Sequence, residues 1–253
     1  MLNNETAEKL RYMKLYGMAE AFRNHLEDMA MENLSFEERF GLLVDSEYVK
    51  RRSAVLQRLI TAASFKMPNA CLEDIEYHAD RKLDRETLTR LSTCAYTSEH
   101  RDVIIMGATG VGKTYIGCAL GNAACRKFLK VKYVRLPELL VDLSIARGDG
   151  SFRRVMNQYR KYRLLILDEW LLMPLDTQSA LDVLEIVEMR HESSSTIFIS
   201  QSAPGGWHSM IGEGRIADAM LDRIINNSYE ILISGDSMRQ KKSFKKKTTE
   251  KSA

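Results

Sequence analysis

Gly107-Ala108-Thr109-Gly110-Val111-Gly112-Lys113-Thr114 fits the pattern G-x-x-x-x-G-K-[ST] at every fixed position. Residues 101–106 before it, RDVIIM, predict a short buried β-strand. Residues 115–130 after it, rich in Ala, Leu and Cys, predict a helix packed on a sheet. This order of strand, glycine-rich loop and helix is the context in which the pattern binds phosphate. The sequence therefore predicts a nucleotide site, and the alternative is a chance glycine turn before a helix.

The spacing of this loop follows from the chemistry of phosphate binding. Its glycines allow backbone conformations and close approaches that a Cβ would block. The loop N–H groups can then point at a polyphosphate, which the positive end of the following helix also attracts. Lys113 can reach the β- and γ-phosphates, and the Thr114 hydroxyl can bind Mg²⁺. The predicted nucleotide contacts are Gly107, Ala108, Thr109, Gly110, Val111, Gly112, Lys113, Thr114 and Tyr115.

Length and composition limit the classes of protein that remain. With 253 residues, 45% of them hydrophobic and 28% charged, the chain resembles a soluble globular protein. No apolar run approaches the roughly 20 residues that span a bilayer, and the N-terminal MLNNE is unlike a secretory signal. The four cysteines contain no C-x-x-C pair. We therefore expect no disulfide framework, zinc site or membrane partner, and a reduced, cytoplasmic setting.

Positive charge is concentrated at the C-terminus. The net charge is +3, yet residues 239–253 alone carry seven Lys or Arg against one Glu. Such a segment predicts a disordered basic tail. It suits attraction to a polyanion, and it equally suits a merely solubilising end.

Residues 1–66 predict a small all-helical domain. Apolar residues recur at helical spacing over 18–29, after a break expected at Gly17. Ser35 and Glu38 form a capping-box pattern that opens the next helix. Because proline and the residue before it resist the helical conformation, we place the domain boundary at Met67-Pro68-Asn69.

The helix that begins at this capping box becomes basic further along. Its basic residues Lys50, Arg51 and Arg52 are followed by apolar residues at helical spacing. This face could follow DNA phosphates, or it could be the solvated side of an amphipathic helix.

Strands and helices alternate after the phosphate loop. Strands are predicted at 131–135, 164–167, 196–200 and 230–233, with helices between them. This alternation predicts an α/β fold with a parallel sheet covered by helices on both faces. The expected domains are residues 1–66 (helical, binding a partner or DNA), 67–238 (nucleotide-binding) and 239–253 (basic tail).

Polar residues at the ends of later strands complete the predicted site. Asp168, at the carboxyl end of a buried strand, can hold Mg²⁺ together with Thr114, and Glu169 can orient or deprotonate an attacking water. Gln201 ends the next strand and could sense the γ-phosphate, or it could be an ordinary loop residue. Arg223 lies on a mostly apolar helix, where it could stabilise phosphoryl charge or pair with Asp218 or Asp222.

Taken together, these motifs resemble the AAA+ ATPases of the DnaC-like helicase-loader group, and most closely the IstB-type helper ATPases of insertion sequences. The resemblance runs through nearly the whole chain. It is carried by the N-terminal LYGMAEA, the LDEW segment with MPL, SQ followed by WH, and the C-terminal ADAMLDR and GDSMR. The family often has a second Asp where this chain has Glu169, and a carboxylate there can do the same work.

The resemblance implies a function. It implies ATP and Mg²⁺ as cofactors, homo-oligomers that bind duplex DNA with little sequence preference, and a cognate transposase as partner. It makes Arg223 an arginine finger acting on a neighbouring subunit, and Arg239 a second arginine near either the nucleotide or the subunit interface. It also implies a DNA-facing helical insertion before residue 164, whose candidate residues are Arg147, Arg153, Arg154, Arg160 and Lys161.

Two other functions are weighed against this one. A replicative-helicase loader would use ATP as a switch and would bind the helicase through residues 1–66. A small-molecule kinase is weaker, because the sequence shows no acceptor-substrate site and leaves Arg223 without a purpose.

Overall fold

The computed structural model describes residues 2–212 and 214–238, so Arg239 and the predicted basic tail lie outside the described residues. The chain divides into two compact units, 1–58 and 59–253. This division falls inside a helix that continues to Ala63, earlier than the boundary expected after residue 66. No helix within the described ranges carries an apolar stretch long enough to cross a membrane.

The first unit is all-helical. It contains α1 (Leu2–Tyr12), α2 (Tyr16–Glu27), the short 3-10 helix η1 (Met29–Asn33) and the beginning of α3 (Phe36–Ala63). The predicted capping box is confirmed: the Ser35 N–H donates to Glu38 Oε2 at 2.8 Å, and the Glu38 N–H donates to Ser35 Oγ at 3.2 Å. These two bonds satisfy backbone donors that the first turn of α3 would otherwise leave unpaired.

The sequence suggested a helix break at Gly17. In the structure Gly17 instead lies within α2, where its lack of a side chain lets α2 and α3 approach each other. It lies in the first turn of α2, where a Cβ would sit 2.8 Å from the carbonyl oxygen of Ser46 on α3. The buried carboxylate of Glu47 accepts hydrogen bonds from the backbone N–H groups of Gly17 (2.7 Å) and Met18 (3.1 Å). Glu47 therefore caps the start of α2 from the neighbouring helix.

The second unit is built on a five-stranded sheet. Its strands are β1 (Asp102–Gly107), β2 (Val131–Arg135), β3 (Leu164–Trp170), β4 (Ser195–Ser200) and β5 (Ser228–Ile233), in the order β2-β3-β4-β1-β5. Every neighbouring pair is parallel. The predicted α/β fold, a parallel sheet flanked by helices and preceded by helices, is confirmed.

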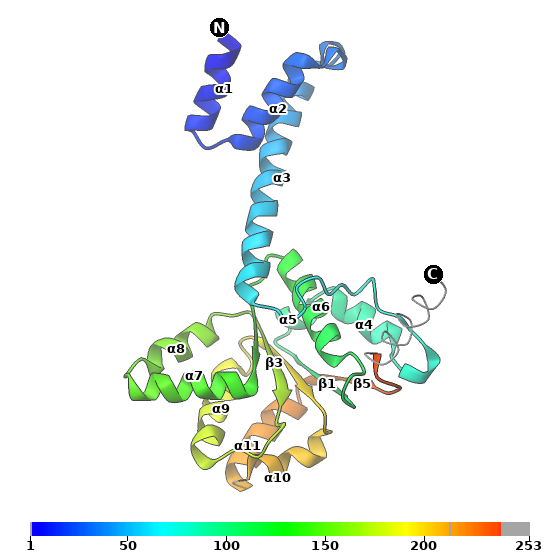
Figure 1. Cartoon of the computed structure of the whole chain (residues 1–253), viewed down its shortest axis with the longest axis vertical. Coiled ribbons are helices and arrows are strands. Elements are labelled where there is room, and N and C mark those ends of the chain that lie inside the picture. Colours follow the sequence, from blue (N-terminus) through cyan, green and yellow to red (C-terminus); the bar gives the residue numbers. More distant parts are fainter. Residues whose placement is uncertain (1, 213, 239–253) are drawn as a thin grey trace, which may run out of the picture. The chain divides into compact units, whose positions relative to one another are not determined.

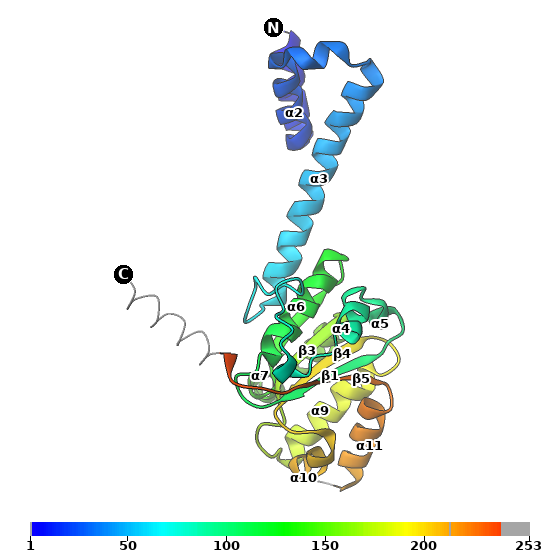
Figure 2. The same cartoon turned by 90° about the vertical axis from the view of Figure 1, so that its right-hand side faces the viewer.

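Helices cover both faces of this sheet (Figures 1 and 2). One face carries α6 (Lys113–Arg126), while α9 (Thr177–Arg190), α10 (Trp207–Ile211) and α11 (Gly214–Ile225) lie on the other (Figure 2). The helices α7 (Leu136–Gly148) and α8 (Phe152–Arg160) follow β2 and pack on α9. The short helices η2 (Ala79–Arg81), α4 (Arg85–Ser92) and α5 (Ala95–Ser98) precede β1, and η3 (Pro204–Gly206) precedes α10.

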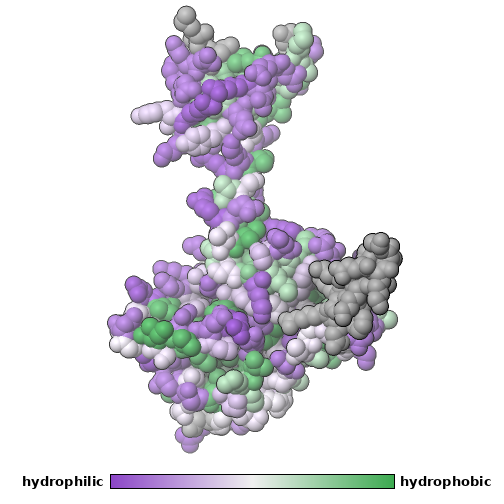
Figure 3. All heavy atoms as spheres, in the orientation of Figure 1, coloured by the Kyte–Doolittle hydropathy of each residue, from purple (hydrophilic) through white to green (hydrophobic). Residues whose placement is uncertain are grey.

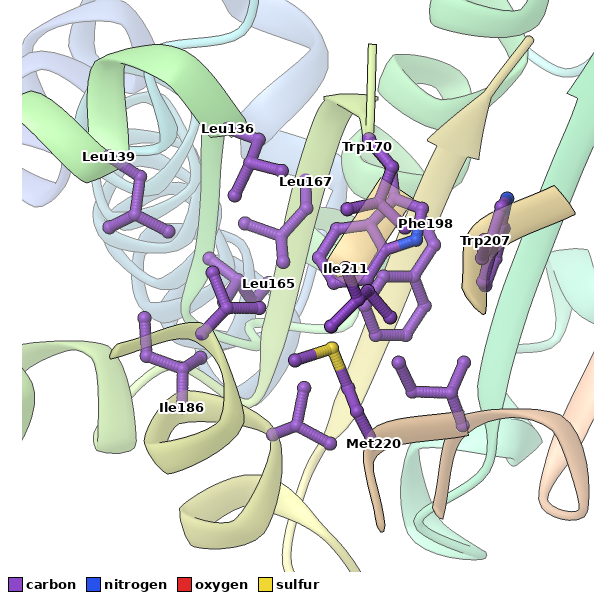
Figure 4. Packing of buried hydrophobic residues seen from close by; sticks show 14 of the residues in the cluster. Leu136, Leu139, Leu165, Leu167, Trp170, Ile186, Phe198, Trp207, Ile211 and Met220 are labelled. Atoms are coloured by element: carbon purple, nitrogen blue, oxygen red, sulfur yellow. The ribbon is translucent and has the colours of Figure 1, made fainter. Parts of the chain in front are cut away.

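Aromatic side chains fill the core between the sheet and α10 (Figure 4). The Trp170 ring contacts Phe198 and Trp207 edge to face, with ring centroids 4.6 and 5.8 Å apart. The Trp207 indole N–H reaches Ser200 Oγ (3.2 Å) and the Ser202 carbonyl (3.1 Å). Edge-to-face aromatic pairs stabilise a core by more than the burial of their surface area alone. This cluster therefore fixes the end of β4 beside the end of β3.

A buried arginine joins α8, α9 and β4. Arg190, at the end of α9, is only 2% exposed. Its guanidinium donates to the carbonyls of Tyr159 (2.8 Å) and Tyr162 (2.9 Å) at the end of α8, and to Ser195 O (2.5 Å) at the start of β4. Burial lowers its pKa to about 10, so it remains charged at neutral pH.

Candidate nucleotide-binding site

The order of the strands brings the predicted motifs to one edge of the sheet. The phosphate loop follows β1, Asp168 and Glu169 close β3, and Gln201 follows β4. Because the strands are parallel and β4 lies between β3 and β1, all three carboxyl ends meet at the same edge. Crevices outside the carboxyl ends of parallel strands are where α/β proteins bind ligands.

The loop has the backbone conformation that the glycine pattern predicts. Gly110 and Gly112 adopt φ angles of +87° and +103°, which disfavour any residue with a Cβ. Gly112 is the N-cap of α6, so the helix begins directly at Lys113. The Lys113 ammonium donates to the carbonyls of Gly107 (2.7 Å) and Ala108 (2.8 Å) and is thereby held over the loop.

Thr114 and Asp168 meet across 54 positions of sequence. The Thr114 hydroxyl donates to Asp168 Oδ2 at 2.8 Å, and Asp168 is 3% exposed. A hydroxyl and a carboxylate oxygen are the hard ligands that Mg²⁺ prefers. The donor set therefore fits the expected metal, although the contact itself is only a hydrogen bond.

Tyr133 is a site residue that the sequence did not reveal. Its hydroxyl, from β2, also donates to Asp168 Oδ2 (2.7 Å), while Asp168 Oδ1 accepts from the Glu169 N–H (2.8 Å). Burial, and then this bond to the carboxylate, raise the pKa of Tyr133 well above its ordinary value. Tyr133 therefore stays a hydrogen-bond donor that orients Asp168. A tyrosine two residues before the end of a strand is too common a pattern to signal this role.

Glu169 is held by a second residue of β2. Its backbone has φ of +56°, and its carboxylate Oε2 lies 2.5 Å from Nη2 of Arg135, with Lys66 Nζ 4.0 Å from Oε1. The hydrogen bond to Glu169 raises the pKa of Arg135. Sequence analysis expected the Glu169 carboxylate to act on an attacking water. In the structure this carboxylate pairs with Arg135, which sequence analysis did not single out.

Gln201 touches the phosphate loop directly. Its side-chain oxygen accepts from the Thr109 hydroxyl at 2.8 Å. Thr109, Lys113, Asp168, Glu169 and Gln201 all line one cavity of about 260 Å³. These predicted residues therefore share one concave site.

A larger cavity of about 510 Å³ also borders the phosphate loop. Gly110, Gly112, Lys113 and Thr114 also line it, with Met67, Asp74, Ile75, Glu76, Arg81, Tyr115 and Met238. Its size and mixed apolar and polar lining suit a small ligand such as a nucleoside. The sequence analysis did not single out residues 72–84, because an irregular segment carries no periodic signal.

Arg223 lies away from this site. It is near the end of α11, and Asn227, just beyond that helix, accepts a bond from the Asp102 N–H at the start of β1 (2.9 Å). The phosphate loop is at the other end of β1, a six-residue strand and so roughly 17–20 Å away. Arg223 pairs with Glu188 of α9 (3.0 Å), whereas the sequence suggested Asp218 or Asp222.

The residues proposed to contact DNA fall into two groups. Several are already engaged: Lys50 with Glu20, Arg51 with Glu47, Arg52 with the Tyr48 hydroxyl, and Arg147 with buried Asp182 and the Phe152 ring. The second group of these residues is exposed and forms no ion pair or side-chain hydrogen bond to another described residue; it consists of Arg153, Arg154, Arg160 and Lys161.

The exposed cations lie on or just after α8, whose opposite side packs inward through Met156 and Tyr159. Hydrophobic surface is also visible over the α7–α8 hairpin (Figure 3), where Val141 and Ile145 of α7 are exposed. This hairpin therefore presents a group of exposed cations.

Comparison with known proteins identifies the family of this chain. Residues 8–246 match the family model described as IstB-like ATP binding protein. A relative in Sinorhizobium fredii, named "Putative insertion sequence ATP-binding protein y4pL", is 40% identical over 95% of this chain and 98% of its own length. An insertion-sequence ATP-binding protein of Mycobacterium tuberculosis is 30% identical over 92% of this chain and 93% of its own.

Solved structures show the same fold at lower identity. The structure of DnaI aligns with a TM-score of 0.58, at 21% identity, over 71% of this chain and 98% of that one. The DnaC helicase loader aligns with a TM-score of 0.54, at 16% identity, over 66% of this chain and 97% of that one. The family match covers nearly the whole sequence, and the sheet order and the contact between the phosphate loop and Asp168 are consistent with it. The chain therefore belongs to the IstB-like ATP-binding family and has an AAA+ P-loop fold.

Proposed function

We propose that this chain hydrolyses ATP with Mg²⁺, assembles into homo-oligomers on duplex DNA and assists the transposase of an insertion sequence. The observation that carries the proposal is the contact between Thr114 of the phosphate loop and Asp168 of β3, in a cavity that also holds Lys113 and Glu169. A polyphosphate with a divalent cation uses all four groups at once.

Each residue then has a definite task. The loop N–H groups and Lys113 hold the β- and γ-phosphates, and Thr114 and Asp168 hold Mg²⁺, which neutralises charge on the phosphates when it is bound. Glu169 orients the attacking water once Arg135 releases it, and Gln201 reports on the γ-phosphate through its contact with Thr109. The larger cavity accommodates the base and ribose.

The position of Arg223 supports assembly. An arginine at the far end of β1 cannot reach the phosphates of its own subunit, but it can be presented to the site of an adjacent copy. Arginine in that role stabilises charge on the transferring phosphoryl group. The ion pair with Glu188 holds the side chain at the surface of α11, where a second copy could receive it.

The cations of α8 support DNA binding without sequence choice. Arg153, Arg154, Arg160 and Lys161 are exposed and have no hydrogen-bond or ion-pair partner in the described part of the chain, as phosphate contacts require. Arg147 is left out of this set, because its guanidinium ties α7 to α9. Relatives named for insertion sequences make a transposase the favoured partner.

A subunit-mixing experiment tests the shared site. Lys113→Ala removes the phosphate contact but keeps Arg223, and Arg223→Ala does the reverse. We expect each variant alone to lack ATP hydrolysis in the presence of duplex DNA, and a mixture of the two to regain part of it. Arg215→Ala, an exposed arginine of the same helix, is the control and should hydrolyse ATP like wild type. An Arg223→Ala variant with wild-type turnover would exclude the arginine finger, and full turnover by Lys113→Ala would exclude the site.

A helicase loader is the second candidate, favoured by the structural likeness to DnaI and the DnaC helicase loader. Pull-down with the full chain distinguishes the two. Capture of a transposase encoded beside this gene supports the first function. Capture of a replicative helicase alone supports the second.

A further inference from the structure

Lys66 brings a second lysine into the smaller cavity beside the phosphate loop. It follows the end of α3 at Ala63, and no motif found in the sequence includes it. Lys66 nevertheless lines the cavity of about 260 Å³ that also contains Lys113 and Glu169. A segment that precedes β1 and the phosphate loop therefore supplies a cation to the proposed site for the phosphates.

The backbone on both sides of Lys66 is fixed against α6, the helix that begins at the phosphate loop. The buried Phe65 ring lies over Gly121 of α6, where a Cβ would be 2.5 Å from a ring carbon. The Asn122 side-chain amide, also on α6, donates to the carbonyl of Pro68 at 2.9 Å. Because these contacts lie close before and after Lys66, the main chain holds this residue at the cavity and the motion left to it is that of its side chain.

The Lys66 ammonium lies beside Glu169 but too far away for a hydrogen bond. Its Nζ is 4.0 Å from Glu169 Oε1, whereas Arg135 Nη2 lies 2.5 Å from Oε2 of the same carboxylate. The Lys66 side chain is also 43% exposed, so water screens this pair and makes it weak. The ammonium can therefore turn from Glu169 to a stronger anion in the same cavity.

Glu169 identifies the anion that this ammonium would meet. The proposed task of Glu169 is to orient the attacking water, and in phosphoryl transfer the attacking oxygen lies roughly in line with the terminal phosphate and the leaving oxygen. A cation 4.0 Å from this carboxylate is therefore on the side of the terminal phosphate. That phosphate carries more negative charge than one carboxylate, so it attracts the ammonium more strongly at equal distance.

We propose that Lys66 leaves Glu169 when ATP enters and binds the γ-phosphate, so that it makes the site prefer a triphosphate to a diphosphate. This inference rests on the proposed ATP site. Lys113 serves both the β- and γ-phosphates, so its loss weakens binding of ATP and ADP alike, whereas a contact confined to the γ-phosphate affects ATP alone. The same movement takes one of its two cations away from the Glu169 carboxylate.

Nucleotide affinity of the full chain tests this role. Dissociation constants for MgADP and for the non-hydrolysable ATP analogue AMPPNP with Mg²⁺ would be measured by titration calorimetry for wild type, Lys66→Met, Lys66→Gln and Lys66→Arg. The matched control is Lys132→Met. Lys132 Nζ donates to Ser64 Oγ (3.2 Å) in the same segment, but Lys132 lines neither of the two cavities described above. Thermal unfolding without nucleotide shows whether each variant is folded.

We expect Lys66→Met and Lys66→Gln to weaken AMPPNP binding by about tenfold or more, because a hydrogen bond between charged groups is lost. Their MgADP dissociation constants should stay within about twofold of wild type, since the weak pair with Glu169 is all that the diphosphate complex loses. Lys66→Arg keeps the charge and should bind AMPPNP within about threefold of wild type. Lys132→Met should bind both nucleotides like wild type. Should Lys66→Met fail to fold, Lys66→Gln carries the comparison.

Three results would overturn the inference, and each is distinguishable from failure of the ATP site. Wild-type AMPPNP affinity in folded Lys66→Met or Lys66→Gln excludes a contact with the γ-phosphate. Equal losses for AMPPNP and MgADP mean a general effect on the site, and Lys66→Arg as weak as Lys66→Met excludes a role for the charge. Wild type that binds neither nucleotide would instead refute the proposed function, and this inference with it.

Discussion

Replacing Tyr133 with Phe would remove one hydroxyl from the centre of the site and leave its packing unchanged. The ring is buried in β2, and its hydroxyl donates to Asp168 Oδ2 at 2.7 Å. Asp168 has two other donors, the Thr114 hydroxyl and the Glu169 N–H. Under the proposed function the Thr114 hydroxyl turns to Mg²⁺, and Tyr133 then becomes the side chain that keeps the carboxylate in place.

The magnitude follows from the kind of bond that is lost. A hydrogen bond to a charged group contributes about 1.5–3 kcal/mol. Because two donors remain, the carboxylate is not stranded, and the lower end, about 1.5 kcal/mol, applies. For a chain of this size that is a fall in Tm of roughly 3–6 °C. Loss of a residue that orients a metal ligand should raise the Mg²⁺ concentration for half-maximal hydrolysis by about tenfold or more.

The assay combines thermal unfolding of the nucleotide-free chain with a Mg²⁺ titration of ATP hydrolysis. Tyr159→Phe is the matched control. It is a tyrosine that is also buried in this unit, and its hydroxyl makes no hydrogen bond within the described ranges. The control should leave the Mg²⁺ requirement unchanged. A Tyr133→Phe variant with a wild-type Mg²⁺ requirement would refute the argument that this hydroxyl orients Asp168.

Three further outcomes are expected. Arg135→Ala should free the Glu169 carboxylate. Because the pair is partly exposed and such pairs are weak, basal ATP hydrolysis should rise by no more than about fivefold with little change in Tm, and an unchanged rate would show that the pair does not restrain Glu169. Burial raises the pKa of Asp102 from 3.8 to about 7, so between about pH 4 and 7 the folded state keeps a proton that the unfolded state has lost, and the free energy of unfolding should fall as pH rises through this range. Asp102→Asn should flatten this pH dependence in urea unfolding curves, and a pH dependence parallel to that of wild type would contradict the assignment. Ser35→Ala should cost the start of α3 about 1 kcal/mol, seen as faster hydrogen exchange at the Glu38 amide, and equal protection would mean that the cap contributes nothing.

The features that the sequence predicted well are those written in short contiguous patterns. The phosphate loop, the apolar run ending at Asp168 and the capping box at Ser35 each combine residue type with fixed spacing. Alternation of strands and helices predicted the parallel sheet. The meeting of Thr114 with Asp168 followed from one further rule, that the carboxyl ends of parallel strands share an edge.

The residues that were missed depend on topology or on irregular backbone. Tyr133 and Arg135 reach Asp168 and Glu169 only because β2 pairs with β3, and strand order is not readable from one sequence. Arg81 lines the larger cavity from a segment without periodicity, and its hydrogen-bond partner Val111 is 30 positions away. The actual partner of Arg223, Glu188, is on another helix, whereas sequence reasoning looked only to its own helix.

The guanidinium of Arg190 has a mechanical consequence. It bonds to two carbonyls at the end of α8 and to Ser195 at the start of β4, and β4 runs from there to Gln201 beside the phosphate loop. Apolar side chains can slide over one another, but three directional bonds to backbone cannot be displaced without being broken. A displacement of the end of α8 is therefore passed through the Arg190 hydrogen bonds to the start of β4, the strand that leads to Gln201.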